Sequence, residues 1–188
     1  MASNRFSEFN TFPQRLAHSW QHSNSMLCVG LDPDISRMPQ GYGTSPAEIE
    51  RFCMEIIKAT AEFACSFKPQ IAYFAANRAE TALENILAYA NEVAPHATTI
   101  LDAKRGDIGA TAKQYAIEAF ERYKADSVTL SPYMGSDSVE PYHAYADRGL
   151  FLLCRTSNPG GNDLQFLNTE KNEALYQTVA KLATTTWN

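Results

Sequence analysis

The residues with the clearest capacity for chemistry lie in one short stretch, Leu101-Asp102-Ala103-Lys104-Arg105-Gly106-Asp107. It follows Thr98-Thr99-Ile100, which favours a β-strand, and successive side chains of a strand point to opposite faces. Asp102 and Lys104 are therefore predicted to share a face. A buried carboxylate or ammonium is costly unless it is paired, so two opposite charges on one face indicate a polar pocket at the end of the strand.

The same Asp-x-Lys triplet could instead form an exposed salt bridge of little energetic consequence. Its context argues against that alternative, because helical segments flank the strand and a strand inside a βα repeat is covered on both faces. Charge then collects at the carboxyl end of the strand. Gly106 and Gly109 loosen the chain beyond that end, which lets Asp107 turn away and Thr111 open the next helix.

Strand and helix patterns alternate five times along the chain. The apolar runs 26–31, 64–69, 98–100, 127–130 and 150–156 are predicted to be strands, the third continuing into the charged stretch. Helices are predicted after Ser45, Asn77 and Thr111, over 138–146 with Gly149 closing it, and over 169–185. A further helix over 6–21, interrupted by Pro13, is predicted to lie across the domain.

Alternating helices and near-continuous apolar strands are typical of a parallel sheet, either an open doubly wound sheet or a (β/α)8 barrel. No Gly-x-Gly-x-x-Gly follows the first strand, which disfavours the open sheet. Polar residues end every strand, as they must if all strand ends ring one site. They are Asp32, Lys68, Asp102 with Lys104, Ser131, and Arg155 to Ser157.

We therefore predict a single α/β domain of TIM-barrel type over residues 1–188. Residues 1–24 form an N-terminal helical extension, and residues 25–188 form strands 1 to 5 with their helices. A complete barrel typically needs about 250 residues, so only about five of the eight strand-helix units are expected in this chain.

Composition argues against several classes of function. The net charge is −5 and no Lys/Arg cluster stands out, so nucleic acid is not an expected partner. The polar N-terminus is no secretory signal, and no apolar run approaches the ~18 residues of a membrane span. Cys28, Cys53, Cys65 and Cys154 lack metal-ligand spacing and lie in apolar runs, so buried free thiols and a cytoplasmic location are expected.

Four motifs lie in order at the predicted strand ends. They are Val29-Gly30-Leu31-Asp32-Pro33-Asp34, Phe67-Lys68-Pro69-Gln70, Leu101-Asp102-Ala103-Lys104-Arg105-Gly106-Asp107-Ile108-Gly109 and Cys154-Arg155-Thr156-Ser157-Asn158-Pro159-Gly160. Together they resemble the orotidine 5'-phosphate decarboxylase family, in particular its longer bacterial branch. The resemblance implies decarboxylation of orotidine 5'-monophosphate to UMP in de novo pyrimidine biosynthesis, with no metal and no organic cofactor.

The resemblance also implies a role for each charged residue. The positions that match the family's alternating charges around the reacting carbon are Lys68, Asp102, Lys104 and Asp107. Lys104 would stabilise the carbanion and protonate C6. Asp102 would lie beside the departing carboxylate, acting either by repulsion or by orienting Lys104. Lys68 would hold the network near the ribose, and Asp107 would enter the site of the neighbouring subunit in a homodimer.

Three further positions match substrate contacts of the family. Asp32 and Thr111 match contacts to the ribose, the latter from the second subunit, and Ser157 matches the residue that reads the pyrimidine edge. Plainer alternatives remain open for three positions. Thr111 could be a helix N-cap, Ser157 a turn residue before Asn-Pro-Gly, and Lys68 a surface lysine with a partly buried stem.

Two other functions are weighed against this one. Relatives on the same scaffold are Mg²⁺-dependent sugar-phosphate decarboxylases or aldolases, and they carry a glutamate ligand at the second strand end, where Lys68 would repel Mg²⁺. The second alternative is a truncated, catalytically dead barrel fragment. The family's phosphate-binding Gln and Arg lie on later loops, and loss of remote binding energy lowers turnover severely.

Overall fold

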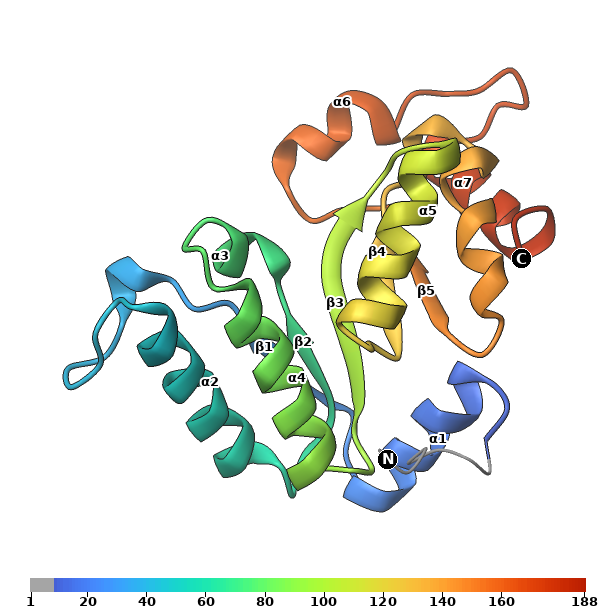
Figure 1. Ribbon diagram of the computed structural model, residues 1–188. Helices are drawn as coiled ribbons and strands as arrows, with labels where there is room; N and C mark the ends of the chain where they lie inside the picture. Colours follow the sequence, from blue (N-terminus) through green and yellow to red (C-terminus); the bar gives the residue numbers. More distant parts are fainter. Residues whose placement is uncertain (1–8) are drawn as a thin grey trace.

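The computed structural model describes residues 9–188 and contains a five-stranded parallel sheet (Figure 1). Its strands are β1 (Leu27–Leu31), β2 (Ala64–Pro69), β3 (Thr98–Arg105), β4 (Ser127–Leu130) and β5 (Gly149–Leu152). They pair in sequence order, β1-β2-β3-β4-β5, and every pair is parallel. A doubly wound sheet reverses its strand order at a switch point, and these five strands show no reversal. The order is that of a TIM-barrel wall.

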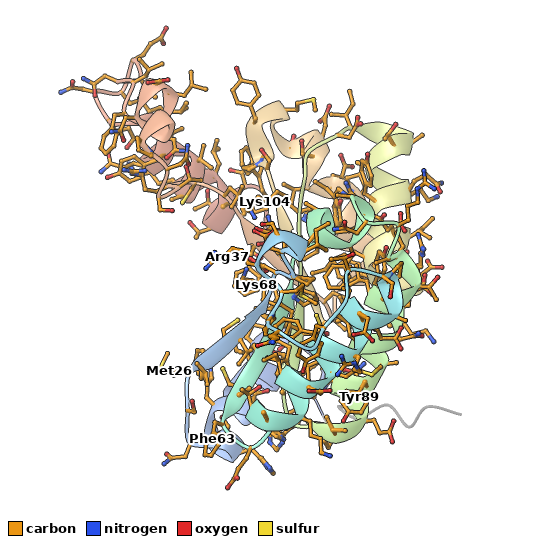
Figure 2. The ribbon with its side chains drawn as sticks, turned by 90° about the vertical axis from the view of Figure 1, so that its left-hand side faces the viewer. Met26, Arg37, Phe63, Lys68, Tyr89 and Lys104 are labelled. Carbon is orange, nitrogen blue, oxygen red and sulfur yellow. The ribbon has the colours of Figure 1, made fainter. Side chains whose placement is uncertain are left out.

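Helices connect the strands and cover one side of the sheet (Figures 1 and 2). The main helices are α1 (Phe12–Ser23), α2 (Pro46–Thr60), α4 (Glu80–Val93), α5 (Gly109–Ile117) and α7 (Leu175–Thr185). Shorter ones are α3 (Ile71–Ala75), α6 (Asn162–Gln165) and the π-helical turn η2 (Glu118–Arg122). The 3₁₀ turns are η1 (Ile35–Arg37), η3 (Pro132–Met134), η4 (Ser136–Ser138), η5 (Glu140–Tyr145) and η6 (Pro159–Gly161). None of the helices in residues 9–188 combines the length and apolar character that crossing a membrane requires.

Helix α2 illustrates how local sequence sets an element. The Ser45 hydroxyl accepts a hydrogen bond from the Glu48 N–H, and Pro46 occupies the first turn, where a missing N–H costs nothing. Helical spacing in the sequence predicts one buried stripe after Ser45, formed by Ile49, Phe52, Cys53, Ile56, Ile57 and Phe63. In the structure Ile49, Cys53 and Ile57 are buried, and Phe52 and Ile56 are partly buried against the core. The prediction for Phe63 was wrong, because this residue lies beyond the helix and is 56% exposed.

The core lies between the sheet and the covering helices. Its largest fully buried side chains include Ile49, Ile57, Phe67, Phe74, Leu83, Ile86, Leu87, Leu101, Val128 and Leu130. They come from β2, β3 and β4 on one side and from α2, α3 and α4 on the other. Each such side chain contributes about 1.5–3 kcal/mol of transfer free energy. This packing stabilises the strands and so fixes the positions of their carboxyl ends.

The predictions for the N-terminal helix and for two of the four cysteines were wrong. The predicted helix over 6–21 begins in residues outside the described range, and α1 runs from Phe12 to Ser23. Pro13 lies in its first turn and opens the helix rather than interrupting it. Cys53 and Cys65 are buried as expected, but Cys28 is exposed on the edge strand β1 and Cys154 is partly exposed.

Other boundaries were wrong toward the C-terminus. The predicted helix over 138–146 is made of 3₁₀ turns, and Gly149 opens β5 instead of closing that helix. Strand β5 ends at Leu152, not at residue 156, and α7 begins at Leu175, not at residue 169. The helix expected at Asn77 begins at Glu80, and the short α3 before it was not predicted.

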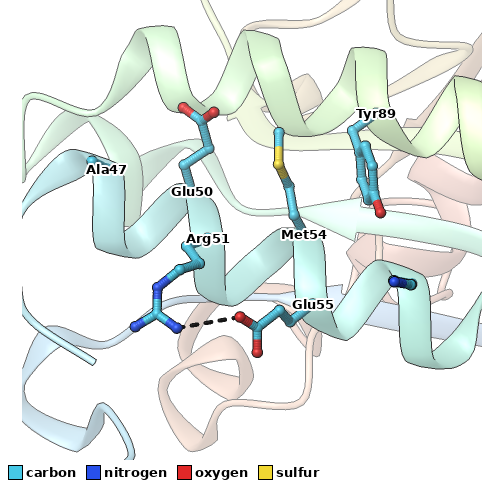
Figure 3. Close-up of a pocket in the computed structure, with 7 residues that line it drawn as sticks. Ala47, Glu50, Arg51, Met54, Glu55 and Tyr89 are labelled. Atoms are coloured by element: carbon cyan, nitrogen blue, oxygen red, sulfur yellow. Dashed lines mark hydrogen bonds and ion pairs between the residues drawn. The ribbon is translucent and has the colours of Figure 1, made fainter. Parts of the chain in front are cut away.

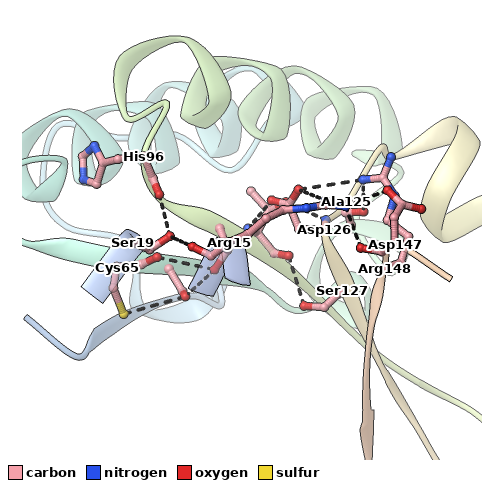
Figure 4. Close-up of polar contacts among 12 residues, drawn as sticks. Arg15, Ser19, Cys65, His96, Ala125, Asp126, Ser127, Asp147 and Arg148 are labelled. Carbon is pink, nitrogen blue, oxygen red and sulfur yellow. Dashed lines mark hydrogen bonds and ion pairs between the residues drawn. The ribbon is translucent and has the colours of Figure 1, made fainter. Parts of the chain in front are cut away.

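A buried ionic network ties α1 to the amino ends of the strands (Figure 4). Arg15 pairs with Asp126 at 3.3 Å, and the partly exposed Asp147 accepts a second bond from Arg15 at 2.6 Å. The Asp126 carboxylate also accepts hydrogen bonds from the Thr99 N–H and hydroxyl, at 2.8 and 3.0 Å. Arg15 and Asp126 are both buried, so removing either charge would leave the other buried without compensation, which is destabilising. This network stabilises the end of the sheet opposite the strand tips.

Candidate active site

Three charged side chains meet where β2 and β3 end. The Lys68 ammonium donates to Oδ2 of Asp102 at 3.0 Å, and the Lys104 ammonium donates to Oδ1 at 2.6 Å. Figure 2 shows both lysines at the same end of the sheet. The Asp102 side chain is 8% exposed, against 33% for Lys68 and 45% for Lys104. The prediction that the side chains of Asp102 and Lys104 lie together is confirmed. The alternative of an exposed salt bridge was wrong, because the Asp102 carboxylate is buried between two ammoniums.

Electrostatics keep this cluster charged. Burial raises the pKa of Asp102, but the hydrogen bonds from Lys104, Lys68 and Thr129 together outweigh it and hold the pKa below its usual value. Partial burial lowers the pKa of Lys68, but the hydrogen bond and charge of Asp102, with a smaller effect of Asp32, raise it above its usual value. Both shifts favour one carboxylate between cations.

The chain after Lys104 is fixed by close contacts. Gly106 passes so near Ser131 that a Cβ on this glycine would lie 2.8 Å from the Ser131 carbonyl oxygen. The Arg105 guanidinium makes a forked ion pair with Glu118 and lies over the Tyr115 ring, 4.3 Å from its centroid. A glycine is required at position 106 because its backbone passes close to that of Ser131. The Arg105 contacts hold the end of the strand against the helix that follows.

Thr129 is a part of the site that sequence reasoning missed. Its hydroxyl donates to Oδ1 of Asp102 at 2.9 Å and accepts from the N–H groups of Ala103 and Lys104, both at 3.0 Å. The only signal in the sequence is a polar residue inside the apolar run Val128-Thr129-Leu130 of the fourth strand.

Within residues 9–188, the other four predicted site residues make no hydrogen bond or ion pair to Lys68, Asp102 or Lys104. Among the described residues, Asp107 makes a local contact, its Oδ1 accepting from the Ile108 N–H at 2.8 Å. Asp32 follows β1 and is exposed, and its charge acts on Lys68 through space. Ser157 is exposed in the loop after β5. Thr111 lies in the first turn of α5, whose N-cap is Ile108, so the N-cap alternative for Thr111 was wrong.

A metal site and a surface hollow are the alternatives to this cluster as a binding site. Within residues 9–188, no three His, Cys, Asp or Glu side chains converge as a metal ion would require. A surface hollow of about 420 Å³ lies between α2 and α4 (Figure 3). There Arg51 pairs with Glu55 one turn further on, at 3.2 Å, which is typical of a solvated helix surface. The cluster around Asp102 is the stronger candidate site.

Comparison with known proteins identifies the lineage of this site. The model of the orotidine 5'-phosphate decarboxylase / HUMPS family matches residues 25–188. This chain belongs to that family. It is 59% identical over 178 residues to the orotidine 5'-phosphate decarboxylase of Dechloromonas aromatica (strain RCB), covering 95% of this chain and 66% of the relative. The corresponding protein of Ralstonia nicotianae is 56% identical over 177 residues, covering 94% and 65%. The chain thus spans about 65% of the length of these curated relatives.

Two solved structures from Leishmania donovani show the same fold. The OMP decarboxylase of Leishmania donovani superimposes with a TM-score of 0.82 at 39% identity, covering 95% of this chain and 66% of that one. The UMP synthase of the same organism gives 0.83 at 39% identity, covering 95% and 37%. The prediction of a TIM-barrel type fold with about five strand-helix units is confirmed.

Proposed function

We propose that this chain carries a decarboxylase site that converts orotidine 5'-monophosphate to UMP in pyrimidine biosynthesis. The observation that carries the proposal is the Asp102 carboxylate held between two ammoniums, 3.0 and 2.6 Å away, at the carboxyl ends of adjacent strands. The names of the curated relatives support it, since they are orotidine 5'-phosphate decarboxylases.

The chemistry needs a cation where negative charge develops. When the bond between C6 and the carboxylate breaks, CO₂ leaves and the electron pair stays on C6. The Lys104 ammonium is the preorganised cation for that pair, and it then transfers one proton to C6 and regains one from solvent. Asp102 fixes the ammonium and lies beside the departing carboxylate. No electron acceptor is consumed, so the proposed reaction balances without an organic cofactor.

The remaining residues bind substrate in this proposal. Lys68 holds Asp102 and reaches the ribose, which Asp32 of the same chain and Thr111 of the second subunit also contact, while Ser157 reads the pyrimidine edge. The family resemblance supports these four assignments. Lys68 also disfavours the Mg²⁺-dependent alternative, because its ammonium lies 3.0 Å from the carboxylate that a Mg²⁺ ion would need.

The proposal includes a homodimer in the cytoplasm. Asp107 of each subunit would enter the site of the other, which is supported by its position on the loop after β3 and by its local contact to Ile108 instead of to its own cluster. The interface of a two-fold symmetric dimer is isologous, so its two shared sites are equivalent.

The decisive experiment is an assay of the purified 188-residue chain that follows the loss of orotidine 5'-monophosphate absorbance. We expect turnover that falls at least about a hundredfold in Lys104→Ala, while that variant still binds UMP. Lys58→Ala, which removes an exposed lysine on α2, is the matched control and keeps full activity. If the Dechloromonas relative turns over under the same conditions and this chain does not, the catalytically dead alternative replaces the proposal.

A further inference from the structure

One hydroxyl connects the backbone and the charges of the site. Thr129 Oγ1 is a donor to Asp102 and an acceptor for the N–H groups of Ala103 and Lys104. The residue is buried, so these three bonds replace contacts with water. A hydroxyl has one proton and two lone pairs, and all three are used here.

The register of the sheet explains why the strand needs this hydroxyl. Leu101 pairs with Val128 and Arg105 pairs with Leu130, so β3 advances four residues where β4 advances two. Extra residues in a strand lose their ladder partners, and a buried N–H without a partner is costly. The Thr129 side chain supplies the acceptor that the β4 backbone does not.

Lys104 lies at the centre of this irregularity with a φ of +49°. Residues with a Cβ rarely adopt this left-handed conformation, and it persists only where the surroundings hold it. The hydrogen bond from the Lys104 N–H to Thr129 is one such restraint. Thr129 and the Lys104 ammonium also meet on the same oxygen, Oδ1 of Asp102, at 2.9 and 2.6 Å.

We propose that Thr129 is a positioning residue of the site: its hydroxyl fixes the backbone turn at Lys104 and orients the Asp102 carboxylate, so that the ammonium is aimed before substrate binds. Only the kinetic consequences of this proposal depend on the proposed function; the positioning of Asp102 and Lys104 does not. Preorganisation of this kind favours the chemical step more than binding, because the charges need no rearrangement in the transition state.

The test compares Thr129→Val, which keeps the shape and removes the hydroxyl, with Thr129→Ser, which keeps the hydroxyl. We expect kcat to fall about 10- to 100-fold in the valine variant with KM nearly unchanged, and the serine variant to recover most of the loss. Thr99→Val is the matched control, since this threonine serves the Asp126 network at the other end of β3 and its loss alters stability without altering kcat.

A second readout does not depend on turnover. Titration of Asp102 by carboxyl ¹³C NMR, assigned with Asp102→Asn, is expected to show a higher pKa in Thr129→Val, because a hydrogen bond to the charged form is lost, and a restored pKa in Thr129→Ser. This titration decides the inference even if the protein does not turn over orotidine 5'-monophosphate, in which case the proposed function alone fails.

Folding of each variant is checked by urea unfolding. If Thr129→Val does not fold, Thr129→Cys is measured instead, since its weak S–H donor predicts changes in the same direction as the valine variant. An unchanged Asp102 titration in the folded variant, or a serine variant that behaves like valine, would overturn the inference.

Discussion

The Lys104 ammonium lies 2.6 Å from the carboxylate of Asp102, a residue two positions earlier in the same strand. In a regular strand such residues are about 7 Å apart along the chain and their side chains run parallel. Here the left-handed φ of Lys104 and the irregular pairing of β3 with β4 interrupt that geometry. The ion pair is therefore a property of the backbone as well as of the two side chains.

Asp102→Asn is expected to lower the pKa of Lys68. Burial lowers that pKa, whereas the hydrogen bond and charge of Asp102 raise it, so in the variant burial is opposed only by the smaller effects of Asp32 and Cys28. Lysine ¹³Cε NMR titration measures the effect, with Asp137→Asn, an exposed carboxylate on η4, as the control. A Lys68 titration that is the same in the wild type and Asp102→Asn would contradict the electrostatic account of the cluster.

A mixture of two inactive variants is expected to regain activity if sites are shared. Asp107→Ala and Lys104→Ala remove different parts of the proposed site, so a mixed dimer has one site with both residues intact. With random exchange, about half of the dimers are mixed, and activity near a quarter of wild type is expected because each mixed dimer carries one intact site. Mixed samples that stay as inactive as the separate variants would count against the shared site.

Gly106→Ala is expected to destabilise the fold by about 1–3 kcal/mol. The added Cβ would lie 2.8 Å from the Ser131 carbonyl oxygen, so the backbone at residue 106 or at Ser131 must move. Gly30→Ala is the matched control, because nothing lies within 4 Å of a Cβ there. Urea unfolding compares the two variants, and equal stability would show that the close approach is relaxed at no cost.

Asp126→Ala is expected to cost about 3–5 kcal/mol of unfolding free energy, because it removes the carboxylate that faces the buried Arg15. Asp147→Ala provides the comparison within the same network. The Asp147 side chain is 50% exposed and Arg15 keeps its bond to the Asp147 carbonyl, so a loss of about 0–1 kcal/mol is expected. A similar loss in both variants would mean that burial does not govern this network.

Acidification is expected to weaken the fold through His96. Burial lowers the pKa of this imidazole, and the neighbouring His22 and His18 lower it further. His96 stacks on His22 with ring centroids 4.3 Å apart. Since the folded state holds the neutral ring, the unfolded chain takes up the proton first, and stability falls as the pH drops below about 6.5.

The measurement is urea unfolding at pH 7.5 and 5.5. His96→Phe keeps a ring without a titrating group and is expected to show a smaller loss on acidification than the wild type. His143→Phe, at an exposed histidine whose ring contacts the Trp187 carbonyl, keeps the wild-type loss. Equal losses in all three proteins would assign the acid sensitivity to other groups.

Local rules were sufficient for much of this fold. The second and fourth strands were predicted over 64–69 and 127–130, as β2 and β4 have them, because apolar runs bounded by charge or proline carry the signal locally. Lys68, Asp102 and Lys104 were predicted together because parallel strands bring their carboxyl ends to one edge. The structure brings these three side chains together, but their catalytic roles stay predictions, as do the roles of Asp32, Asp107, Thr111 and Ser157.

Contacts that depend on register could not be predicted. Thr129 meets Asp102 only because β3 and β4 pair irregularly, and alternation along a strand treats Lys104 as a regular residue with negative φ. Arg15 and Asp126 are 111 positions apart and meet only after α1 docks under the sheet. Phe63 was predicted wrongly for a related reason, since helical spacing continues in the sequence after α2 has ended at Thr60.

The cluster around Asp126 and the cluster around Asp102 lie at opposite ends of the same strands, β3 and β4. Asp126 precedes β4, and Thr129, three residues or roughly 10 Å further along, serves the other end. Substitutions around Arg15 can therefore change the thermal stability of the fold while the two ammoniums beside Asp102 keep their positions.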